Sequence, residues 1–78
     1  MWIKPKDHKV VGEGLADARE RAGLTQQQLA KKLGKPQSFI SSYERGQRRV
    51  DVLEFVRIAQ AIRVDPAKAF AKIIANCL

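Results

Sequence analysis

Residues 24–46 read LTQQQLAKKLGKPQSFISSYERG, and this stretch predicts two short helices joined by a tight turn. Leu29 and Leu33 are four residues apart, as are Pro36 and Ile40, so each helix has a narrow apolar stripe at helical spacing. Amide, hydroxyl and cationic side chains occupy most of the other positions. Each helix therefore needs the rest of the chain to cover its apolar side and leaves a polar side free.

The ends of both helices carry residues that favour helix termini. Thr25 precedes the first helix and can cap it through its side-chain oxygen, and Gln28 completes the spacing of a capping box. Gly34 stands where a positive φ is usually needed, and Pro36 suits the first turn of the next helix because its missing N–H would have no helical partner there. Since Ala30 is small enough to let the helices cross closely, the predicted geometry is a helix-turn-helix.

In these residues the chain resembles the phage repressor and Cro type family of helix-turn-helix DNA-binding domains. With Gln26 as the first motif position, that family has a small residue at the fifth position, glycine at the ninth and a branched apolar residue at the fifteenth, where this chain has Ala30, Gly34 and Ile40. The resemblance implies an all-α, five-helix repressor-like domain whose helix-turn-helix is formed by helices 2 and 3. An ordinary helical hairpin within another small bundle is the alternative interpretation.

Length and composition indicate one small domain without a metal or cofactor. The chain has 78 residues, 45% of them hydrophobic, with no apolar run of about 18 residues and no signal-peptide pattern, so we expect a soluble, cytoplasmic protein. The single Cys77 cannot form an internal disulfide, and with one His8 it does not make a metal site. The expected division is an N-terminal arm over residues 1–9, the DNA-binding domain over 10–76 and a tail over 77–78.

The net charge of +7 is concentrated on the helix-turn-helix and the loop after it. Segment 31–49 has six cations and one acid, Glu44, which gives +5, whereas segment 50–64 sums to zero. The cations are Lys31, Lys32, Lys35, Arg45, Arg48 and Arg49. A polyanion is the partner expected for such a basic segment.

The N-terminal residues before the motif predict an arm and one helix. Residues 1–9 lack helical periodicity and are expected to be extended, with lysines that contact DNA phosphates or with Trp2 packed on the surface. Apolar residues recur at helical spacing from about Val11 to Ala22 and predict a helix there. Its glycines, at positions 12 and 14, each cost about 1 kcal/mol relative to alanine and weaken its first turn.

Two more helices follow the motif. Asp51 is a plausible cap for a helix through Ile62, whose apolar residues leave little of it polar, so we expect it to be the central core helix. Asp65 and Pro66 mark the start of the last helix. Its apolar side exceeds what a small monomer should expose, which predicts a homodimer interface. The interface residues are Phe70, Ile73, Ile74 and Leu78.

The family resemblance also implies an internal ion pair and a mode of DNA binding. The family has an arginine and a glutamate that pair at the positions of Arg19 and Glu44. Its second motif helix lies in the major groove, with its exposed first half at the base edges. The residues expected to read bases are Gln37, Ser38, Ser41 and Ser42.

Gln37 is the best candidate for base reading because its amide can make a bidentate contact with adenine. Phe39 is expected to pack against Tyr43 instead of meeting a thymine methyl group. In the family the position of Gln26 braces the glutamine that corresponds to Gln37. Contacts with DNA phosphates would set affinity and register, not sequence preference. The residues expected to make them are Thr25, Gln26, Lys35, Arg45, Gln47, Arg48 and Arg49.

The function that these features predict is a transcriptional regulator, a repressor that binds a palindromic operator in double-stranded DNA as a homodimer. An enzyme is not predicted, because the sequence has no Ser–His–Asp or Cys–His candidate and no paired carboxylates. An antitoxin-type module of the same fold, which binds a partner toxin and its own promoter, is the alternative. RNA binding is disfavoured because the expected aromatic stacking platform is absent.

Overall fold

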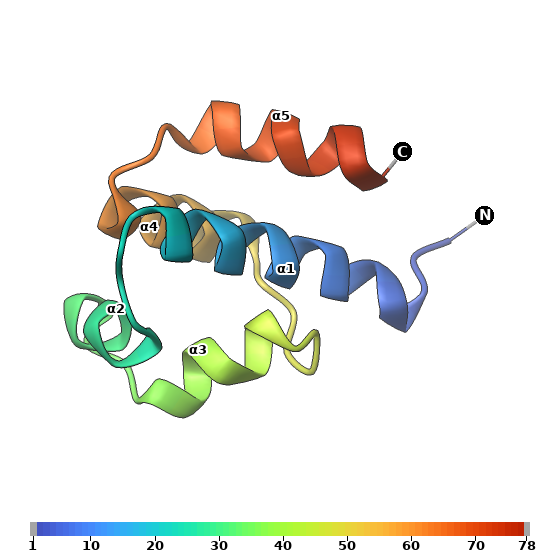
Figure 1. Ribbon diagram of the computed structural model, residues 1–78. Coiled ribbons are helices and arrows are strands. Elements are labelled where there is room, and N and C mark those ends of the chain that lie inside the picture. The colour runs from blue at the N-terminus through green and yellow to red at the C-terminus, as the bar shows by residue number, and fades with distance from the viewer. Residues whose placement is uncertain (1, 78) are drawn as a thin grey trace.

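The computed structural model describes residues 2–77, which form five α-helices and no strand. Figure 1 shows α1, α4 and α5 packed together on one side, with the α2–α3 pair below α1. This arrangement confirms the predicted all-α, five-helix fold with the helix-turn-helix as helices 2 and 3. No helix among these residues is long and apolar enough to cross a membrane. The helices are α1 (Pro5–Arg21), α2 (Gln26–Leu33), α3 (Gln37–Glu44), α4 (Val52–Ile62) and α5 (Pro66–Cys77).

The predicted helix caps around the motif are present. Thr25 Oγ1 accepts a hydrogen bond from the Gln28 backbone N–H at 3.1 Å, and the Thr25 N–H donates to Gln28 Oε1 at 2.9 Å. Gly34 ends α2 with φ of 68°, in the left-handed region that favours glycine. Pro36 is the N-cap of α3, one position before the helix and not inside its first turn. The turn between α2 and α3 thus has Gly34 at its start and Pro36, whose ring restricts its backbone conformation, at its end.

Helix α1 begins at Pro5, so the predicted start near Val11 was wrong. The Lys4 N–H donates to the Asp7 carboxylate at 2.8 Å, which closes the first turn, and proline suits the first helical position. Residues 5–9 of the predicted arm are thus helical. Trp2 precedes the helix with 84% of its surface exposed, so the interpretation that it packs on the surface was also wrong.

The two glycines that lower the helix propensity of α1 are explained by tertiary packing. A Cβ at Gly12 would lie 2.0 Å from the Tyr43 carbonyl oxygen in α3. A Cβ at Gly14 would lie 2.5 Å from the Ile73 Cγ1 in α5. Glycine therefore lets α1 approach both neighbours closely, and the packing outweighs a local cost of about 1 kcal/mol per glycine.

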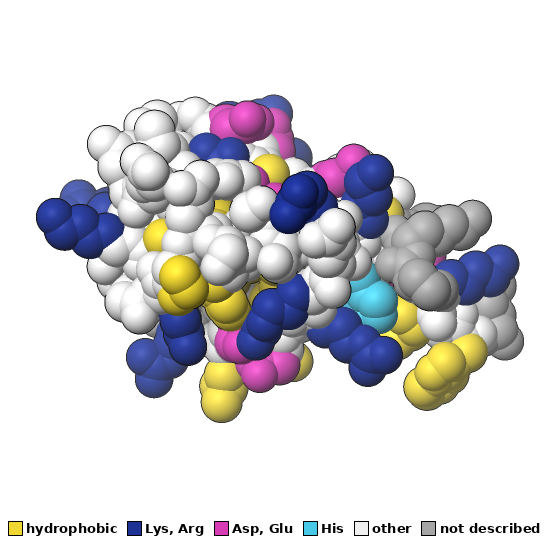
Figure 2. Space-filling view, turned by 90° about the horizontal axis from the view of Figure 1, so that it is seen from below, with side chains coloured by type: hydrophobic (Ala, Val, Ile, Leu, Met, Phe, Trp, Pro, Cys, Tyr) yellow, Lys and Arg dark blue, Asp and Glu magenta, His cyan; other side chains and the backbone are white. Residues whose placement is uncertain are grey.

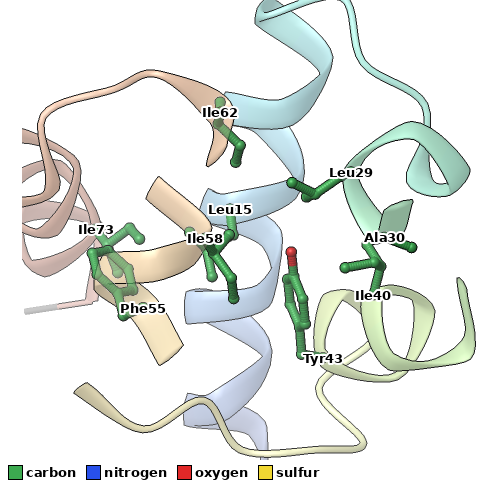
Figure 3. Close-up of a cluster of buried hydrophobic side chains, with 9 residues drawn as sticks. All are labelled: Leu15, Leu29, Ala30, Ile40, Tyr43, Phe55, Ile58, Ile62 and Ile73. Carbon is green, nitrogen blue, oxygen red and sulfur yellow. The ribbon is translucent and has the colours of Figure 1, made fainter. Parts of the chain in front are cut away.

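A single hydrophobic core connects all five helices. Figure 3 shows its nine buried side chains, with the Tyr43 ring between α1 and the motif helices. Tyr43 is fully buried, and its hydroxyl has no hydrogen-bond partner among the described residues. The core side chains are Leu15, Leu29, Ala30, Ile40, Tyr43, Phe55, Ile58, Ile62 and Ile73.

The structure differs from the prediction in which apolar residues of α4 and α5 are buried in the core and which are exposed. Ile73 was expected to be exposed in a dimer interface, but it is buried in the core of the monomer, where it fills the space beside Gly14. Val52 and Leu53, at the start of α4, are exposed, so the first turn of this helix does not belong to the core. Phe70 is 54% exposed.

The other two residues of the predicted dimer interface add little to its exposed area. Ile74 is partly buried, and Leu78 lies outside the described residues. The exposed part of the predicted interface is therefore mainly Phe70, whose ring packs edge-on against Phe55 at a centroid distance of 5.9 Å.

Candidate nucleic-acid interface

Helix α3 turns its apolar residues inward and its small polar residues outward. Ile40 and Tyr43 have no exposed surface, whereas Gln37 and Ser38 at its N-terminal end are exposed. The other two predicted base readers, Ser41 and Ser42, are partly buried along the same helix. The N-terminal half of α3 is therefore the part most open to a ligand.

The predicted ion pair between Arg19 and Glu44 is present and joins α1 to the end of α3. Arg19 Nε donates to Glu44 Oε2 at 2.8 Å and Arg19 Nη2 donates to Glu44 Oε1 at 3.2 Å. Both residues are buried, and Arg19 Nη1 also donates to the Leu24 carbonyl oxygen at 2.7 Å. Hydrogen bonding to the Glu44 carboxylate raises the pKa of Arg19. The pair fixes the C-terminal end of α3 against α1.

Gln26 extends this network from Glu44 to the exposed end of α3. Gln26 Nε2 donates to Glu44 Oε1 at 2.9 Å, and Gln26 Oε1 accepts a hydrogen bond from Gln37 Nε2 at 3.2 Å. The side chains of Arg19, Glu44, Gln26 and Gln37 thus form one continuous chain. The side-chain oxygen of Gln37, Oε1, and the second hydrogen on its Nε2 make no hydrogen bond among the described residues. These are the two groups that a glutamine uses in a bidentate contact with adenine.

Basic side chains surround this helix. Figure 2 views the side on which α2 and α3 lie in Figure 1 and shows Lys and Arg side chains distributed over the face, with a few hydrophobic and acidic side chains among them. Lys35 precedes α3, and Arg45, Gln47 and Arg49 follow it; all four are exposed. Thr25 is also exposed, and its hydroxyl accepts the capping hydrogen bond of α2.

Arg48 differs from its basic neighbours because it is already paired. Its Nη1 and Nη2 donate to the two carboxylate oxygens of Glu54 at 2.9 and 2.7 Å. These hydrogen bonds raise the pKa of Arg48, and they are the main cause of the lowering of the pKa of Glu54 to about 2. The pair was not predicted from the sequence, although the spacing of Asp51 and Glu54 matches a capping box and could have indicated that Glu54 is held in place.

The described residues offer no site for a metal ion. They contain no group of three or more His, Cys, Asp and Glu side chains that could coordinate one. A hollow of about 950 Å³ lies between α1 and α5 and is lined by residues of both helices and of the α4–α5 connection. Asp17 at its edge is paired with Arg21 at 3.0 Å and lies 3.9 Å from Lys72.

The sequence model of the helix-turn-helix family matches residues 15–68. The uncharacterized HTH-type transcriptional regulator y4dJ of Sinorhizobium fredii (strain NBRC 101917 / NGR234) is 39% identical over 56 residues, which cover 72% of this chain and 73% of that protein. The family match includes the whole of α2, α3 and α4, so the similarity extends beyond the motif itself.

Solved structures share the fold over most of its length. An XRE-family like protein from Pseudomonas syringae pv. tomato str. DC3000 has a TM-score of 0.80 and 39% identity, covering 91% of this chain and 87% of that one. The restriction-modification controller protein C.AhdI from Aeromonas hydrophila has a TM-score of 0.76 and 32% identity, with coverage of 83% and 98%. The clp gene regulator ClgR from C. glutamicum has a TM-score of 0.83 at 20% identity, with coverage of 90% and 91%, and shares the fold.

Proposed function

This chain belongs to the helix-turn-helix family of DNA-binding transcriptional regulators, of the Cro and XRE type, and we propose that it is a repressor that binds a palindromic operator as a homodimer. The observation that carries the proposal is the position of Gln37. It lies exposed at the start of α3, and its side chain is held by Gln26 with its oxygen and one N–H free. A base reader held in this way loses little conformational entropy on binding.

In the proposed complex, α3 enters the major groove and its N-terminal half faces the base edges. Gln37 makes a bidentate contact with the N6 and N7 atoms of adenine. Ser38, Ser41 and Ser42 make shorter contacts that discriminate less, some of them through water.

The basic and polar residues around α3 bind the DNA backbone. Phosphate contacts from Lys35, Arg45 and Arg49 would flank the groove at both ends of the helix. Thr25, Gln26 and Gln47 would add uncharged hydrogen bonds to phosphate oxygens, with Gln26 at the positive N-terminal end of α2. Such contacts make the affinity depend steeply on salt concentration.

The homodimer would form through exposed apolar side chains on α4 and α5. Val52, Leu53 and Phe70 are exposed, and a domain of this size has a small core, so burying them between two copies would add stability. Two copies related by a two-fold axis would place their α3 helices about 34 Å apart, one turn of DNA. The operator would then be an inverted repeat with half-sites about 10 base pairs apart.

Selection of bound sites from a random DNA pool tests this function directly. The expected result is an enriched inverted repeat with an adenine at one fixed position of each half-site. An enriched site without a repeat would contradict the homodimer but not DNA reading by α3. No enrichment at all would contradict sequence-specific binding.

A module that binds a partner protein is the second candidate, and the hollow between α1 and α5 is the observation that favours it. Its lining includes three apolar residues: Ala18 on α1, Val64 in the α4–α5 connection and Ala69 on α5. Under this alternative the purified chain would be stable only with its partner. Sedimentation of the protein alone separates the two, because a regulator should be a soluble dimer at tens of micromolar.

A further inference from the structure

Arg48 lies where α3, the following loop and the start of α4 meet. Besides its two hydrogen bonds to Glu54, its Nη1 donates to the Arg49 carbonyl oxygen at 2.8 Å, and its backbone N–H donates to the Ser42 carbonyl oxygen at 3.3 Å. Its guanidinium also lies over the ring of Phe39, with the Cζ atom 4.5 Å from the ring centroid. Arg48 thus contacts both helices at once.

Phe39 transmits this contact to the core. Its ring packs edge-on against the ring of Tyr43, with a centroid distance of 5.6 Å and an interplanar angle of 76°. Tyr43 has no exposed surface and lies in the hydrophobic core. Since Phe39 is on the same helix as Gln37, the placement of its ring affects the placement of the base reader.

Glu54 is a fixed anchor for Arg48 because its carboxylate takes part in the cap of α4. The Asp51 N–H donates to Glu54 Oε1 at 3.1 Å, and the Glu54 N–H donates to Asp51 Oδ1 at 2.8 Å. The Glu54 carboxylate therefore has both its position and its negative charge set by α4. Its lowered pKa keeps it ionised at every pH at which DNA binding would be measured.

We propose that Arg48 is a positioning residue that holds α3 at its angle to α4, through Glu54 on one side and Phe39 on the other, and that it does not contact a phosphate. This inference rests on the proposed function and replaces the role that the sequence suggested for Arg48. Arginine suits this position because its planar guanidinium can bind both carboxylate oxygens of Glu54 through its N–H groups while its face stacks on the Phe39 ring.

The two roles predict opposite effects when Glu54 is removed. If Arg48 positions α3, then Glu54→Ala and Arg48→Ala should each lower the ratio of operator affinity to scrambled-DNA affinity about tenfold. The reason is that a displaced Gln37 no longer reaches the adenine with both its side-chain oxygen and its N–H. The double variant should be no worse than either single variant. If Arg48 is a phosphate contact, then Glu54→Ala frees a cation and should tighten binding to both DNAs.

Salt titrations of these variants on operator and scrambled duplexes make the test. Arg48→Ala should leave the salt slope unchanged, and Arg48→Lys should not restore the affinity ratio, since lysine keeps the charge but lacks the fork. Glu13→Ala is the control for removal of an exposed acid, and Arg49→Ala is the control for removal of an exposed cation. A slope reduced by about 0.9 for each subunit in Arg48→Ala, or rescue by Arg48→Lys, would overturn the proposal.

Wild-type protein provides a measurement that does not depend on the folding of variants. The Arg48 side-chain protons should show the upfield NMR shift of protons over the Phe39 ring, in the free protein and in the operator complex alike. Disappearance of that shift on binding operator would show that Arg48 leaves Phe39 for the DNA and would contradict the proposal. If instead the protein selects no site from random DNA, the proposed function fails, while the shift in the free protein still reports the Arg48 contact.

Discussion

Gln37 donates a hydrogen bond from its Nε2 to the Oε1 of Gln26 at 3.2 Å, across the turn of the helix-turn-helix. Gln26 is in turn held by Glu44, which is paired with the buried Arg19. The exposed residue proposed to read a base is therefore connected to the interior of the protein by three consecutive side chains. A substitution in the buried part of this chain of side chains should lower the free energy of unfolding and, through Gln37, should also alter base preference.

Replacing Glu44 with alanine should destabilise the fold by about 2–4 kcal/mol, because it leaves the Arg19 guanidinium buried without its carboxylate. Urea denaturation followed by circular dichroism would measure the change. Glu20→Ala is the matched control: its carboxylate lies 3.9 Å from the same arginine but is exposed, so it should change stability by less than about 0.5 kcal/mol. Equal midpoints for wild type and Glu44→Ala would contradict the structural role of the pair.

The helix ends and the motif could be predicted from sequence because they depend on residues close together in the chain. Thr25, Gly34 and Asp51 each act on neighbours within a few positions, and the structure confirms them. The start of α1 was missed, although Pro5 and Asp7 are local signals for it, because the glycines predict a weak first turn. The low helix propensity of Gly12 is visible in the sequence, whereas the packing of Tyr43 against it joins residues far apart in the chain.

The candidate site was predictable only in part for the same reason. The pairing of Arg19 with Glu44 followed from the family resemblance and not from spacing, since 25 residues separate the two. Charge alone placed Arg48 with the phosphate contacts, because Glu54 lies on the next helix and its approach depends on how the loop folds. The buried position of Ile73 likewise depends on the absence of a side chain at Gly14.

A methyl group at position 12 should be far more disruptive than one at position 14. In Gly12→Ala the added Cβ would meet a backbone oxygen at 2.0 Å, which can move only if α3 moves. In Gly14→Ala the obstacle is the side chain of Ile73, which can adopt another rotamer. We expect a destabilisation of more than about 3 kcal/mol for Gly12→Ala, the upper end for overpacking, and of about 1–2 kcal/mol for Gly14→Ala. Thermal unfolding of the two variants measures this, and equal destabilisation would contradict it.

Tyr43→Phe should raise the stability of the fold by about 1 kcal/mol, because the hydroxyl of Tyr43 is buried without a hydrogen-bond partner among the described residues. Denaturation midpoints of the two proteins give the sign. A large decrease in stability in the phenylalanine variant would show that the hydroxyl is in fact hydrogen-bonded.

The same tyrosine should also show its burial through pH. Burial raises the pKa of Tyr43 above its ordinary value of 10.0, so its neutral form contributes stability that is present below pH 10 and is lost as the pH rises further. Because Tyr43 is the only tyrosine of the chain, ultraviolet absorbance near 295 nm can follow its ionisation directly. Tyrosinate should appear only when the protein unfolds. Ionisation near pH 10 in folded protein would contradict its burial.

Acid should weaken the contact between Arg48 and Glu54 only at very low pH. The pKa of Glu54 is lowered from 4.5 to about 2, so its contribution to stability is complete above pH 4.5 and is lost as the pH falls toward 2. Because the two side chains are 40% and 26% exposed, solvent screening reduces this contribution to about 1 kcal/mol. The difference in unfolding free energy between wild type and Glu54→Gln, measured from pH 6 to pH 2, should shrink over that interval. A constant difference would mean that the charge of Glu54 is irrelevant.

Base reading and phosphate binding should separate when Gln37 and Arg49 are each replaced by alanine. Gln37→Ala should cost about 1–3 kcal/mol at the operator and relax the preference at one base pair of each half-site, while binding to scrambled DNA changes little. Arg49 lies exposed in the loop beyond α3, where its guanidinium is open to a phosphate. Arg49→Ala should therefore weaken operator and scrambled DNA about equally and lower the salt slope by about 0.9 for each phosphate that the variant no longer binds, or about twice that in a dimer. Salt titrations on both duplexes decide the assignment, and the proposed placement of α3 in the major groove fails if Arg49→Ala alters base preference while Gln37→Ala leaves it intact.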